Sequence, residues 1–279
     1  MRILVTGARG MLGQAVVRTA GVGHEVVALG RDELDVSDVD AVRRRLEDER
    51  PDAVVHCAAY TDVDGAEGDL RAAMAGNAEH PRTVADAAEA VGATMVYPSS
   101  DYVFDGHKGE PYVESDTARP QSVYGQSKLA GEHEVAGTSP RHLVVRSSWL
   151  FGPGGRNFVD TMLGLAVEHG EVAVVSDQVG CPTYTGHLAE GIVELLEDGS
   201  SGLRHLAASG RCSWHELALE TFRRCDVHCV VREATTAELG RPAPRPPLSV
   251  LVSERSDAVV LPSWEDGLGA YLAERAVRA

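Results

Sequence analysis

Short runs of consecutive apolar residues, many of them β-branched, alternate with longer stretches of helical periodicity through the first half of the chain. Such runs are typical of parallel strands that are covered on both faces. The predicted strands lie at residues 3–5, 24–29, 53–57, 94–97 and 142–146, and helical patterns lie between them at residues 11–20, 37–49 and about 70–92. This alternation predicts an α/β fold with a doubly wound parallel sheet, whose ligands bind beyond the carboxyl ends of the strands.

The pattern changes after Trp149. The second half is expected to contain a glycine-rich loop at 152–155, a helix at 156–169, a strand at 172–175 and a last amphipathic helix that starts at the cap of residues 263–266. The proline-rich segment 241–247 cannot form the interior of a helix or strand, because proline lacks the amide hydrogen. We expect a main domain at residues 1–150, to which parts of residues 185–210 return, and a smaller lobe formed mainly by residues 151–279.

The charge balance argues against nucleic-acid binding. The chain has 279 residues, of which 26 are lysine or arginine and 42 are aspartate or glutamate, so its formal net charge is −16. Binding a phosphate backbone needs a broad basic surface. No apolar run approaches the roughly 20 residues that cross a bilayer, and the start of the chain has no signal-peptide pattern. We therefore expect a small-molecule ligand and neither a nucleic-acid nor a membrane partner.

The five cysteines are odd in number and contain no CxxC pair. A reduced cytoplasm is the simplest setting for such a set. Cys225, His228 and Cys229 lie close together in the sequence, but a second pair at ligand spacing is missing. We expect a cytoplasmic protein without a metal site.

Three glycines, Gly7, Gly10 and Gly13, follow the first predicted strand and open the first predicted helix. Glycines at this place let the chain turn tightly, let a pyrophosphate approach backbone N–H groups and let the helix pack closely on the strand. The strand, turn and helix around them distinguish this pattern from a chance spacing of glycines. It predicts a dinucleotide site, so residues 1–150 become a dinucleotide-binding domain of the Rossmann type.

The residues after the second strand bear on the choice of dinucleotide. An acidic side chain there accepts hydrogen bonds from the adenosine ribose, whereas an arginine pairs with a 2′-phosphate. Arg31 favours NADPH, with Arg9 of the glycine loop as a helper, and the adjacent Asp32 leaves NADH open. Asp35 and Val36 lie just beyond, within reach of the adenine.

Tyr124 and Lys128 form a YxxxK pattern on a predicted helix, where a spacing of four places both side chains on one face. A neighbouring cation lowers the pKa of a phenol from its usual value of about 10 and makes it a usable general acid. The pattern gains weight because Lys108 and Lys128 are the only lysines, all other basic residues being arginine. An ammonium group kept under that bias indicates chemistry that a guanidinium cannot do.

Ser100 lies at the carboxyl end of the fourth strand, 24 positions before Tyr124. A hydroxyl group at that place can donate a hydrogen bond to a substrate carbonyl and hold it against the phenol. The alternative reading of a serine at a strand end is a simple cap.

With these residues in hand, the chain resembles the extended short-chain dehydrogenase/reductases, and within them the dTDP-4-dehydrorhamnose reductase family. The resemblance covers nearly the whole length. Beyond the glycine motif it rests on the segments 58–64, 100–106, 123–129, 146–150, 157–158 and 177–183. Segments 100–106 and 177–183 are much more specific to the family than the generic triad of serine, tyrosine and lysine.

The resemblance implies NAD(P)H-dependent reduction of the C4 ketone of a dTDP-4-keto-6-deoxyhexose, with dTDP-4-dehydro-L-rhamnose as the leading substrate. It implies that Tyr124 donates the proton to O4, that Lys128 tunes it and holds the nicotinamide ribose, and that Ser100 orients the carbonyl. The cofactor contacts that it implies are Gly7, Gly10, Met11, Leu12 and Gly13 around the pyrophosphate, and Ala58, Ala59 and Tyr60 after the third strand. The sugar contacts that it implies are Asp101, Trp149 and Asn157, and family habit makes a homodimer the candidate assembly.

Two departures from the family pattern leave the sugar open. Ser100 stands where the family usually has threonine, and Cys181 stands where serine is common. Neither threatens the reaction, and both leave room for another C4 configuration. The alternatives are a sister 4-ketoreductase of natural-product deoxysugar biosynthesis and a non-catalytic subunit that binds the cofactor and regulates another enzyme.

Arg245 lies in the proline-rich segment 241–247. An acidic protein needs local arginines to accept an anionic nucleotide sugar, so Arg245 is a candidate clamp for the diphosphate of the substrate. A surface arginine in a loop is the alternative.

Overall fold

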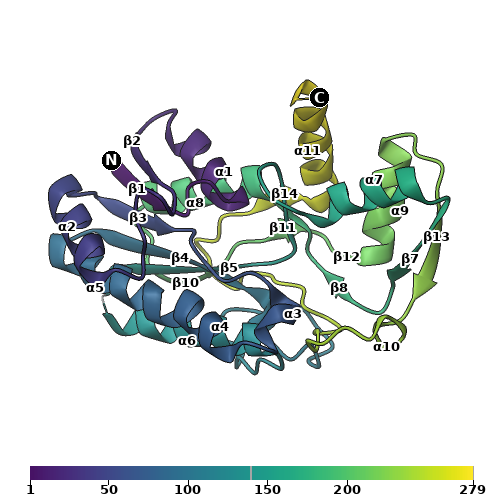
Figure 1. Cartoon of the computed structure of the whole chain (residues 1–279), viewed down its shortest axis with the longest axis horizontal. Coiled ribbons are helices and arrows are strands. Elements are labelled where there is room, and N and C mark those ends of the chain that lie inside the picture. Colours follow the sequence, from purple (N-terminus) through teal and green to yellow (C-terminus); the bar gives the residue numbers. More distant parts are fainter. Residues whose placement is uncertain (139, 279) are drawn as a thin grey trace.

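Six parallel strands form the central sheet of the molecule (Figure 1). The computed structural model describes residues 1–138 and 140–278. In sequence order the strands are β1 (Arg2–Thr6), β2 (Glu25–Leu29), β3 (Ala53–His56), β4 (Thr94–Ser100), β5 (His142–Ser147) and β10 (Gly202–His205), and in space they follow the order β10, β5, β4, β3, β1, β2. The predicted doubly wound parallel sheet is confirmed. Among the predicted strands, β4 differs most in its bounds: it continues to Ser100, so the candidate hydroxyl group ends the strand itself.

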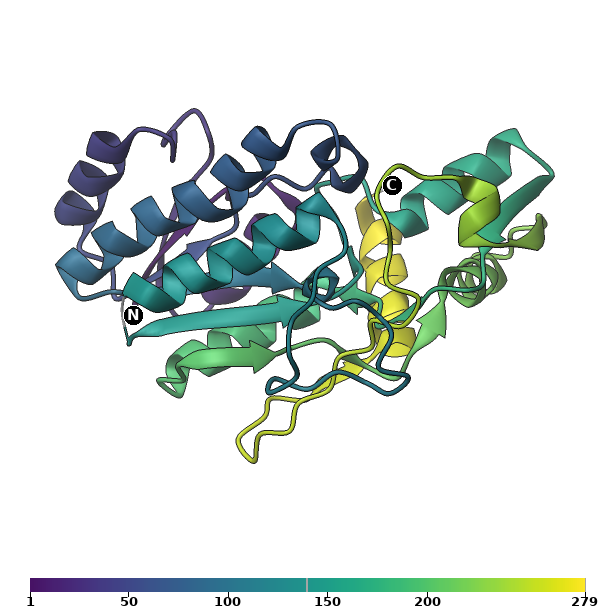
Figure 2. The same cartoon turned by 90° about the horizontal axis from the view of Figure 1, so that it is seen from below.

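Helices cover both faces of this sheet, as the alternation of buried side chains along the strands requires. Ile3 and Val5 face the core under α1 (Met11–Ala20) and α8 (Thr185–Glu197), whereas Leu4 faces the opposite core. The helices of that opposite face are α2 (Val39–Glu49), α5 (His80–Val91) and α6 (Val123–Thr138). Figure 2 shows α5 and α6 lying side by side across the strands. Both faces of the sheet are therefore covered, and the carboxyl edge of the sheet is the place where a ligand can bind.

The single helix predicted at about 70–92 is wrong in detail. The chain forms α3 (Val63–Ala66), α4 (Leu70–Met74), a π-helical turn (Ala75–Glu79) and then α5. A Cβ atom at Gly76 would lie 2.9 Å from the Cβ of Tyr60, so the turn packs directly on the segment that follows β3. Turns of this kind occur often at functional sites, and this one carries the buried Asn77.

A smaller lobe packs around a separate apolar core. Its helices are α7 (Phe158–Glu168), α9 (Trp214–Arg224), α10 (Thr236–Leu239) and α11 (Trp264–Arg278), and its longer strands are β7 (Glu171–Val175) and β13 (Val230–Ala234), which pair in parallel. The core of this lobe joins α7, α9 and α11. The predicted last helix is confirmed, because Ser263 accepts a hydrogen bond from the amide of Asp266 at the start of α11.

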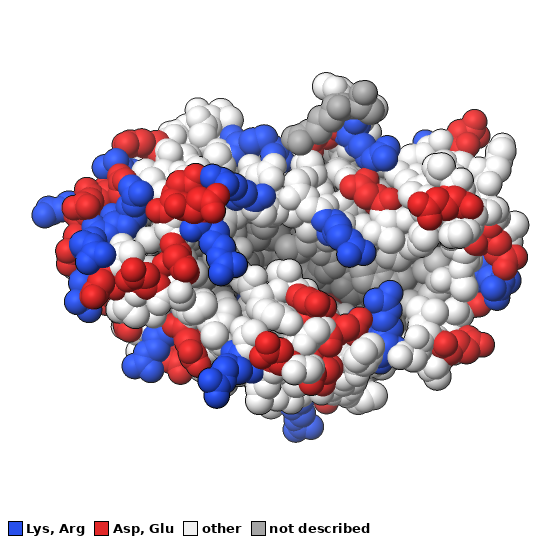
Figure 3. Space-filling model, in the orientation of Figure 1, with Lys and Arg blue, Asp and Glu red and all other residues white. Residues whose placement is uncertain are grey.

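The chain crosses between the two parts of the molecule several times. Short strands tie the crossings together: β6 (Leu150–Phe151) pairs with β9 (Thr183–Tyr184), β8 (Val179–Gly180) with β12 (Cys212–Ser213), and β11 (Ala208–Ser209) with β14 (Leu261–Ser263). Between these crossings, α8 packs on α1 and β10 adds to the edge of the sheet beside β5. The molecule is hollowed between the sheet and the smaller lobe (Figure 3).

Within the described ranges, no helix is both long and apolar enough to cross a membrane. Acidic and basic side chains are interspersed on the face that Figure 3 shows.

Candidate active site

The turn after β1 is shaped to approach a ligand closely. Gly7 has a left-handed φ of 62°, and a Cβ atom there would lie 2.5 Å from the amide nitrogen of Ala58. A Cβ atom at Gly13 would lie 2.3 Å from the carbonyl oxygen of Gly7. Both contacts are far too short, so only glycine fits. The turn thereby brings the start of α1 against the segment that follows β3.

The amino terminus of α1 fits an anion. Gly10 occupies its N-cap without a side-chain hydrogen bond, and the first turn, which begins at Met11 and Leu12, contains no acidic residue. The first amide N–H groups of a helix have no partner within the helix, and its dipole favours negative charge at this end. A pyrophosphate therefore fits the place where the sequence predicts it.

Arg9 is engaged by two carboxylates at the end of β2. It donates to Asp32 at 2.6 Å and to Glu33, and Glu33 also accepts the amide of Gly30 at 2.9 Å. The charge of Arg9 is thus already balanced within the protein. Arg31 is exposed at the same strand end.

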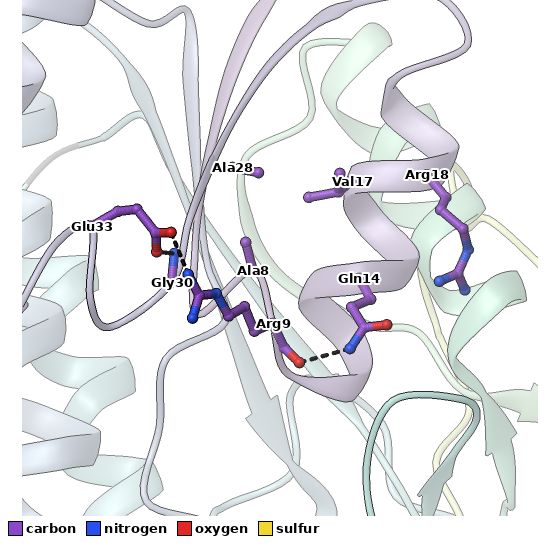
Figure 4. Close-up of a pocket in the computed structure, with 8 residues that line it drawn as sticks. All are labelled: Ala8, Arg9, Gln14, Val17, Arg18, Ala28, Gly30 and Glu33. Atoms are coloured by element: carbon purple, nitrogen blue, oxygen red, sulfur yellow. Dashed lines mark hydrogen bonds and ion pairs between the residues drawn. The ribbon is translucent and has the colours of Figure 1, made fainter.

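These residues border an open groove of about 440 Å³ (Figure 4). It is lined by Ala8, Arg9, Gln14, Val17, Arg18, Ala28, Gly30 and Glu33. Figure 4 shows Arg9 and Glu33 in contact on one side, Gln14 and Val17 facing them from α1, and Arg18 on the far side of the same helix. Asp35 and Val36 follow in the same loop, where the Asp35 carboxylate accepts hydrogen bonds from Ser37 that lower its pKa.

Tyr124 and Lys128 lie on the same face of α6, opposite the end of β4. Ser100 lies close enough to the phenol of Tyr124 to act on its pKa, which it lowers. The ammonium group of Lys128 donates to the carbonyl oxygen of Pro98 at 2.7 Å and lies 4.2 Å from the centre of the Tyr97 ring. The structure therefore brings Ser100, Tyr124 and Lys128 together, as the sequence predicts.

The protonation of this pair differs from the simple expectation. Burial, with a smaller contribution from Asp101, raises the pKa of Tyr124 to about 12, although Ser100 acts in the opposite direction. Burial lowers the pKa of Lys128 to about 7. The expected lowering of the tyrosine pKa by Lys128 is not found in this structure. A raised pKa keeps the phenol protonated, which is the state that a proton donor needs.

Asp101 is the first residue after β4 and is almost fully buried. Ser100 donates a hydrogen bond to its carboxylate at 3.1 Å, and Ser249 lies beside it. Burial raises the pKa of Asp101 to about 7, although Ser249 and Ser100 act in the opposite direction. Near neutral pH this carboxyl group can thus accept or donate a hydrogen bond, which suits a contact with a sugar hydroxyl group.

Ala58, Ala59 and Tyr60 follow β3 at the carboxyl edge, and the buried Asn77 holds them in place. The side chain of Asn77 accepts the amide of Tyr60 and donates to its carbonyl oxygen, both at 3.0 Å. It also donates to Ser127 at 2.9 Å, one turn of helix from Tyr124. The amide of Asn77 thereby links the predicted cofactor side of the site to the helix that carries the tyrosine.

Trp149 has a left-handed φ of 49°, which is unusual for a bulky residue. Its indole ring stacks on that of Trp214, the first residue of α9. A Cβ atom at Gly180 would lie 2.5 Å from the Trp149 ring, so Gly180 also packs closely against it. Trp149 is therefore fixed between the sheet and the smaller lobe.

Asn157 caps α7. Its side chain accepts the amide of Asp160 at 3.0 Å and donates to the carbonyl oxygen of Gly152 at 3.0 Å and to the hydroxyl oxygen of Tyr271 at 3.1 Å. Both polar atoms thus have partners inside the protein. A contact with substrate would have to displace one of them.

Arg245 is not a free surface arginine. It donates to Asp64 at 2.9 Å and to the carbonyl oxygen of Ala243 at 2.8 Å, and its side chain is 14% exposed. Although burial opposes the shift, the hydrogen bonds and charge of Arg245, with help from Ala243 and Arg241, lower the pKa of Asp64 to about 2. Asp64 lies in the first turn of α3, so this pair joins the proline-rich loop to the main domain.

Several residues around the site were not singled out from the sequence. Asn77, Glu132, Tyr102, Asp64 and Trp214 contact the predicted residues or their neighbours. Asp64, Tyr102 and the start of α6 lie inside the segments that carry the family resemblance, which is the one signal that pointed to them. Across the described part of the chain, no group of three or more histidine, cysteine, aspartate or glutamate side chains could hold a metal ion.

Comparison with known proteins gives consistent matches over the whole chain. Residues 1–277 match the family described as RmlD substrate binding domain. The dTDP-4-dehydrorhamnose reductase of Streptomyces griseus is 44% identical over 268 residues, which cover 93% of this chain and 88% of that protein. A probable dTDP-4,6-dihydroxy-2-methyloxan-3-one 4-ketoreductase of Streptomyces antibioticus is 44% identical over 91% of this chain and 88% of its own length. The crystal structure of the Bacillus anthracis dTDP-4-dehydrorhamnose reductase in complex with NADP superimposes with a TM-score of 0.95 at 37% identity, covering 98% of this chain and 99% of that one.

Proposed function

Because the chain belongs to the RmlD substrate binding domain family, we propose that it reduces the C4 ketone of dTDP-4-dehydro-L-rhamnose to dTDP-L-rhamnose with NADPH. The observation that carries this proposal is the placement of Ser100, Tyr124 and Lys128 at the carboxyl edge of the sheet. The relatives named dTDP-4-dehydrorhamnose reductase support the substrate, and the relative crystallised with NADP supports the cofactor.

The residues of this chain would bind the dinucleotide along that edge. The start of α1, from Gly10 to Leu12, holds the pyrophosphate, and Arg31 holds the 2′-phosphate beside the engaged Arg9. Ala58 to Tyr60 border the nicotinamide half, and Lys128 donates to the nicotinamide ribose. The bound cofactor supplies the hydride that reduces the ketone.

The chemistry asked of the protein is orientation of the ketone and delivery of one proton. Ser100 donates a hydrogen bond to O4, and Tyr124 gives its phenolic proton to the same oxygen as negative charge develops there. The high pKa of Tyr124 keeps that proton in place until then, and the positive charge of Lys128 stabilises the phenolate that remains. Asp101 and Trp149 contact the sugar, and Arg245 contacts the diphosphate.

A second candidate is a sister 4-ketoreductase that makes the other C4 configuration or acts on a differently substituted deoxysugar. The 44% identity to the Streptomyces antibioticus ketoreductase favours it over a non-catalytic subunit. The intact serine, tyrosine and lysine also argue against the regulatory alternative. A homodimer stays part of the proposal.

An assay of NADPH oxidation with enzymatically generated dTDP-4-dehydrorhamnose tests the proposal, followed by NMR of the product. Turnover to the L-rhamno product is the expected result. Turnover to the other C4 configuration, or only with another dTDP-keto sugar, selects the second candidate. NADPH binding with no turnover of any such sugar contradicts both.

A further inference from the structure

Helix α6 presents three side chains, not two, to the end of β4. Tyr124, Lys128 and Glu132 follow one another at intervals of four residues, which places them in one row along the helix. Lys128 donates to the carbonyl oxygen of Pro98 at 2.7 Å, and Glu132 accepts the hydroxyl group of Ser99 at 2.5 Å. The third member of the row has no part in the proposed reaction.

Glu132 is held by a second strand as well. Arg146 of β5 donates to both of its carboxylate oxygens, through Nε at 2.8 Å and through Nη2 at 2.6 Å. Arg146 lies directly opposite Ser99 in the β4–β5 register, and its guanidinium carbon lies 4.9 Å from the centre of the Phe104 ring. The side chains of Arg146 and Glu132 are 5% and 6% exposed, so this is a buried ion pair.

A buried ion pair seldom adds stability over apolar residues of the same volume. Stability alone therefore does not explain why the Glu132–Arg146 ion pair lies beside the helix that carries Tyr124 and Lys128. The position of Glu132, one turn beyond Lys128, offers another reason, because a carboxylate there acts on the charge of the lysine.

The groups that face Lys128 come from three elements. Tyr97 of β4 lies under its ammonium group, and His56 and Cys57 approach from the end of β3. Burial raises the pKa of Cys57 to about 12 and that of Tyr97 above its usual value, and it lowers the pKa of His56 to about 3. All three are thus neutral near pH 7.

On its own helix, Lys128 faces Tyr124, whose raised pKa keeps it neutral too, and Glu132. Among the described residues that face Lys128, Glu132 is therefore the one that carries negative charge. It opposes the effect of burial, which pulls the pKa of Lys128 down to about 7.

We propose that Glu132 is a positioning residue, whose carboxylate keeps the buried Lys128 amine protonated and whose bond to Ser99 fixes the strand end that carries Ser100. The inference rests on the proposed function, because it takes Lys128 as the partner of Tyr124 in the reduction. A carboxylate with this role needs a fixed position, and the two hydrogen bonds from Arg146 provide it.

The scarcity of lysine makes a direct test feasible. In a Lys108→Arg parent, Lys128 is the only lysine, so labelling with [ε-¹³C]lysine gives a single resonance whose pH titration reports its protonation. Lys108 lies in a loop, where it binds Asp116 and the carbonyl oxygen of Pro111, and its replacement is expected to leave activity unchanged. In the same background, Glu132→Gln is expected to lower the titration midpoint of Lys128 by about one pH unit.

An unchanged midpoint in the folded Glu132→Gln protein would overturn the proposal. If this variant fails to fold because Arg146 is left buried and unpaired, the double variant Glu132→Gln/Arg146→Met removes both charges. Arg146 is not among the groups that shift the pKa of Lys128, so the same downward displacement is expected. An unchanged titration midpoint of Lys128 in the double variant would also overturn the proposal.

Kinetics separate this role from a merely structural one. The basic limb of the kcat profile should move to lower pH in Glu132→Gln, in step with the lysine titration, whereas damage to the fold would lower kcat without moving the limb. The titration needs no sugar substrate. If the Lys108→Arg parent reduces no dTDP-keto sugar, the proposed function fails, and the lysine titration still decides whether Glu132 controls the charge of Lys128.

Discussion

The indole rings of Trp149 and Trp214 lie face to face, with 3.6 Å between their centroids and 4° between their planes. Trp149 follows β5 of the main domain and Trp214 begins α9 of the smaller lobe. Trp214 also donates to the side chain of Gln178 at 3.2 Å. The pair therefore ties the predicted sugar contact to the position of the smaller lobe.

Replacing Trp214 should loosen Trp149 and weaken sugar binding. An aromatic pair contributes about 0.5–1.5 kcal/mol, so we expect Trp214→Ala to raise the KM for the dTDP-sugar about three- to tenfold, with no change in the Kd for NADPH. Trp214→Phe, which keeps a stacking surface, should recover most of the loss. An unchanged KM in Trp214→Ala would show that Trp149 does not need its partner.

Arg245 should bind the substrate diphosphate while it keeps its ion pair with Asp64. We expect Arg245→Ala to raise the KM for the sugar nucleotide at least tenfold, because a charge-assisted hydrogen bond to phosphate is lost. Arg241→Ala is the matched control, since Arg241 also pairs with Asp64, at 3.2 Å, and is far more exposed. Equal effects of the two variants, or an unchanged KM in Arg245→Ala, would remove Arg245 from the substrate site.

Arg31 should set the preference for NADPH over NADH. Because Asp32 and Glu33 already balance the charge of Arg9, Arg31→Ala is expected to weaken NADPH binding by roughly tenfold and to leave NADH binding nearly unchanged. Arg44→Ala, an exposed change on α2, serves as the control. Titration with both cofactors measures the ratio, and an equal loss for NADPH and NADH would contradict the assignment.

The buried His56 should make the protein sensitive to acid. Its Nδ1 atom lies 2.8 Å from the Thr6 hydroxyl oxygen, and burial, aided by the charges of Lys128 and His80, lowers its pKa to about 3. In the unfolded chain this imidazole takes up a proton near pH 6.5. Between about pH 6.5 and pH 3 the unfolded state therefore binds more protons than the folded state. The free energy of unfolding falls as the pH is lowered through this range.

Urea unfolding at several pH values measures this slope. In His56→Gln the loss of stability below about pH 6.5 should be shallower than in the unchanged chain. His107→Gln, which removes an exposed histidine, should keep the original slope. If His56→Gln and the unchanged chain lose stability in parallel, His56 is not the sensor.

The sequence predicts the scaffold of the site because its signals are local. Strand periodicity, the glycines at 7, 10 and 13, and the spacing of Tyr124 and Lys128 each depend on residues a few positions apart. The carboxyl edge of a parallel sheet then brings Ser100 to the tyrosine without further information. The same rule accounts for the position of Ala58 to Tyr60.

Local sequence patterns do not predict contacts between segments that lie far apart in the chain. The pairing of Arg245 with Asp64 spans 181 positions, and that of Trp149 with Trp214 joins two lobes. The π-helical turn around Asn77 has no periodic signature, so an unbroken helix was the natural expectation. The sequence predicts a lowered pKa for Tyr124, whereas burial, which periodicity does not measure, raises it.

The most direct test of the central claim is the fate of a labelled hydride. With NADPH that carries deuterium at the transferable position of the nicotinamide, and with dTDP-4-dehydrorhamnose as substrate, NMR of the product should show deuterium at C4 of an L-rhamno sugar. The Tyr124→Phe variant should bind NADPH with unchanged affinity and form this product at least a hundredfold more slowly. Deuterium at another carbon, no transfer at all, or full activity in Tyr124→Phe would contradict the account.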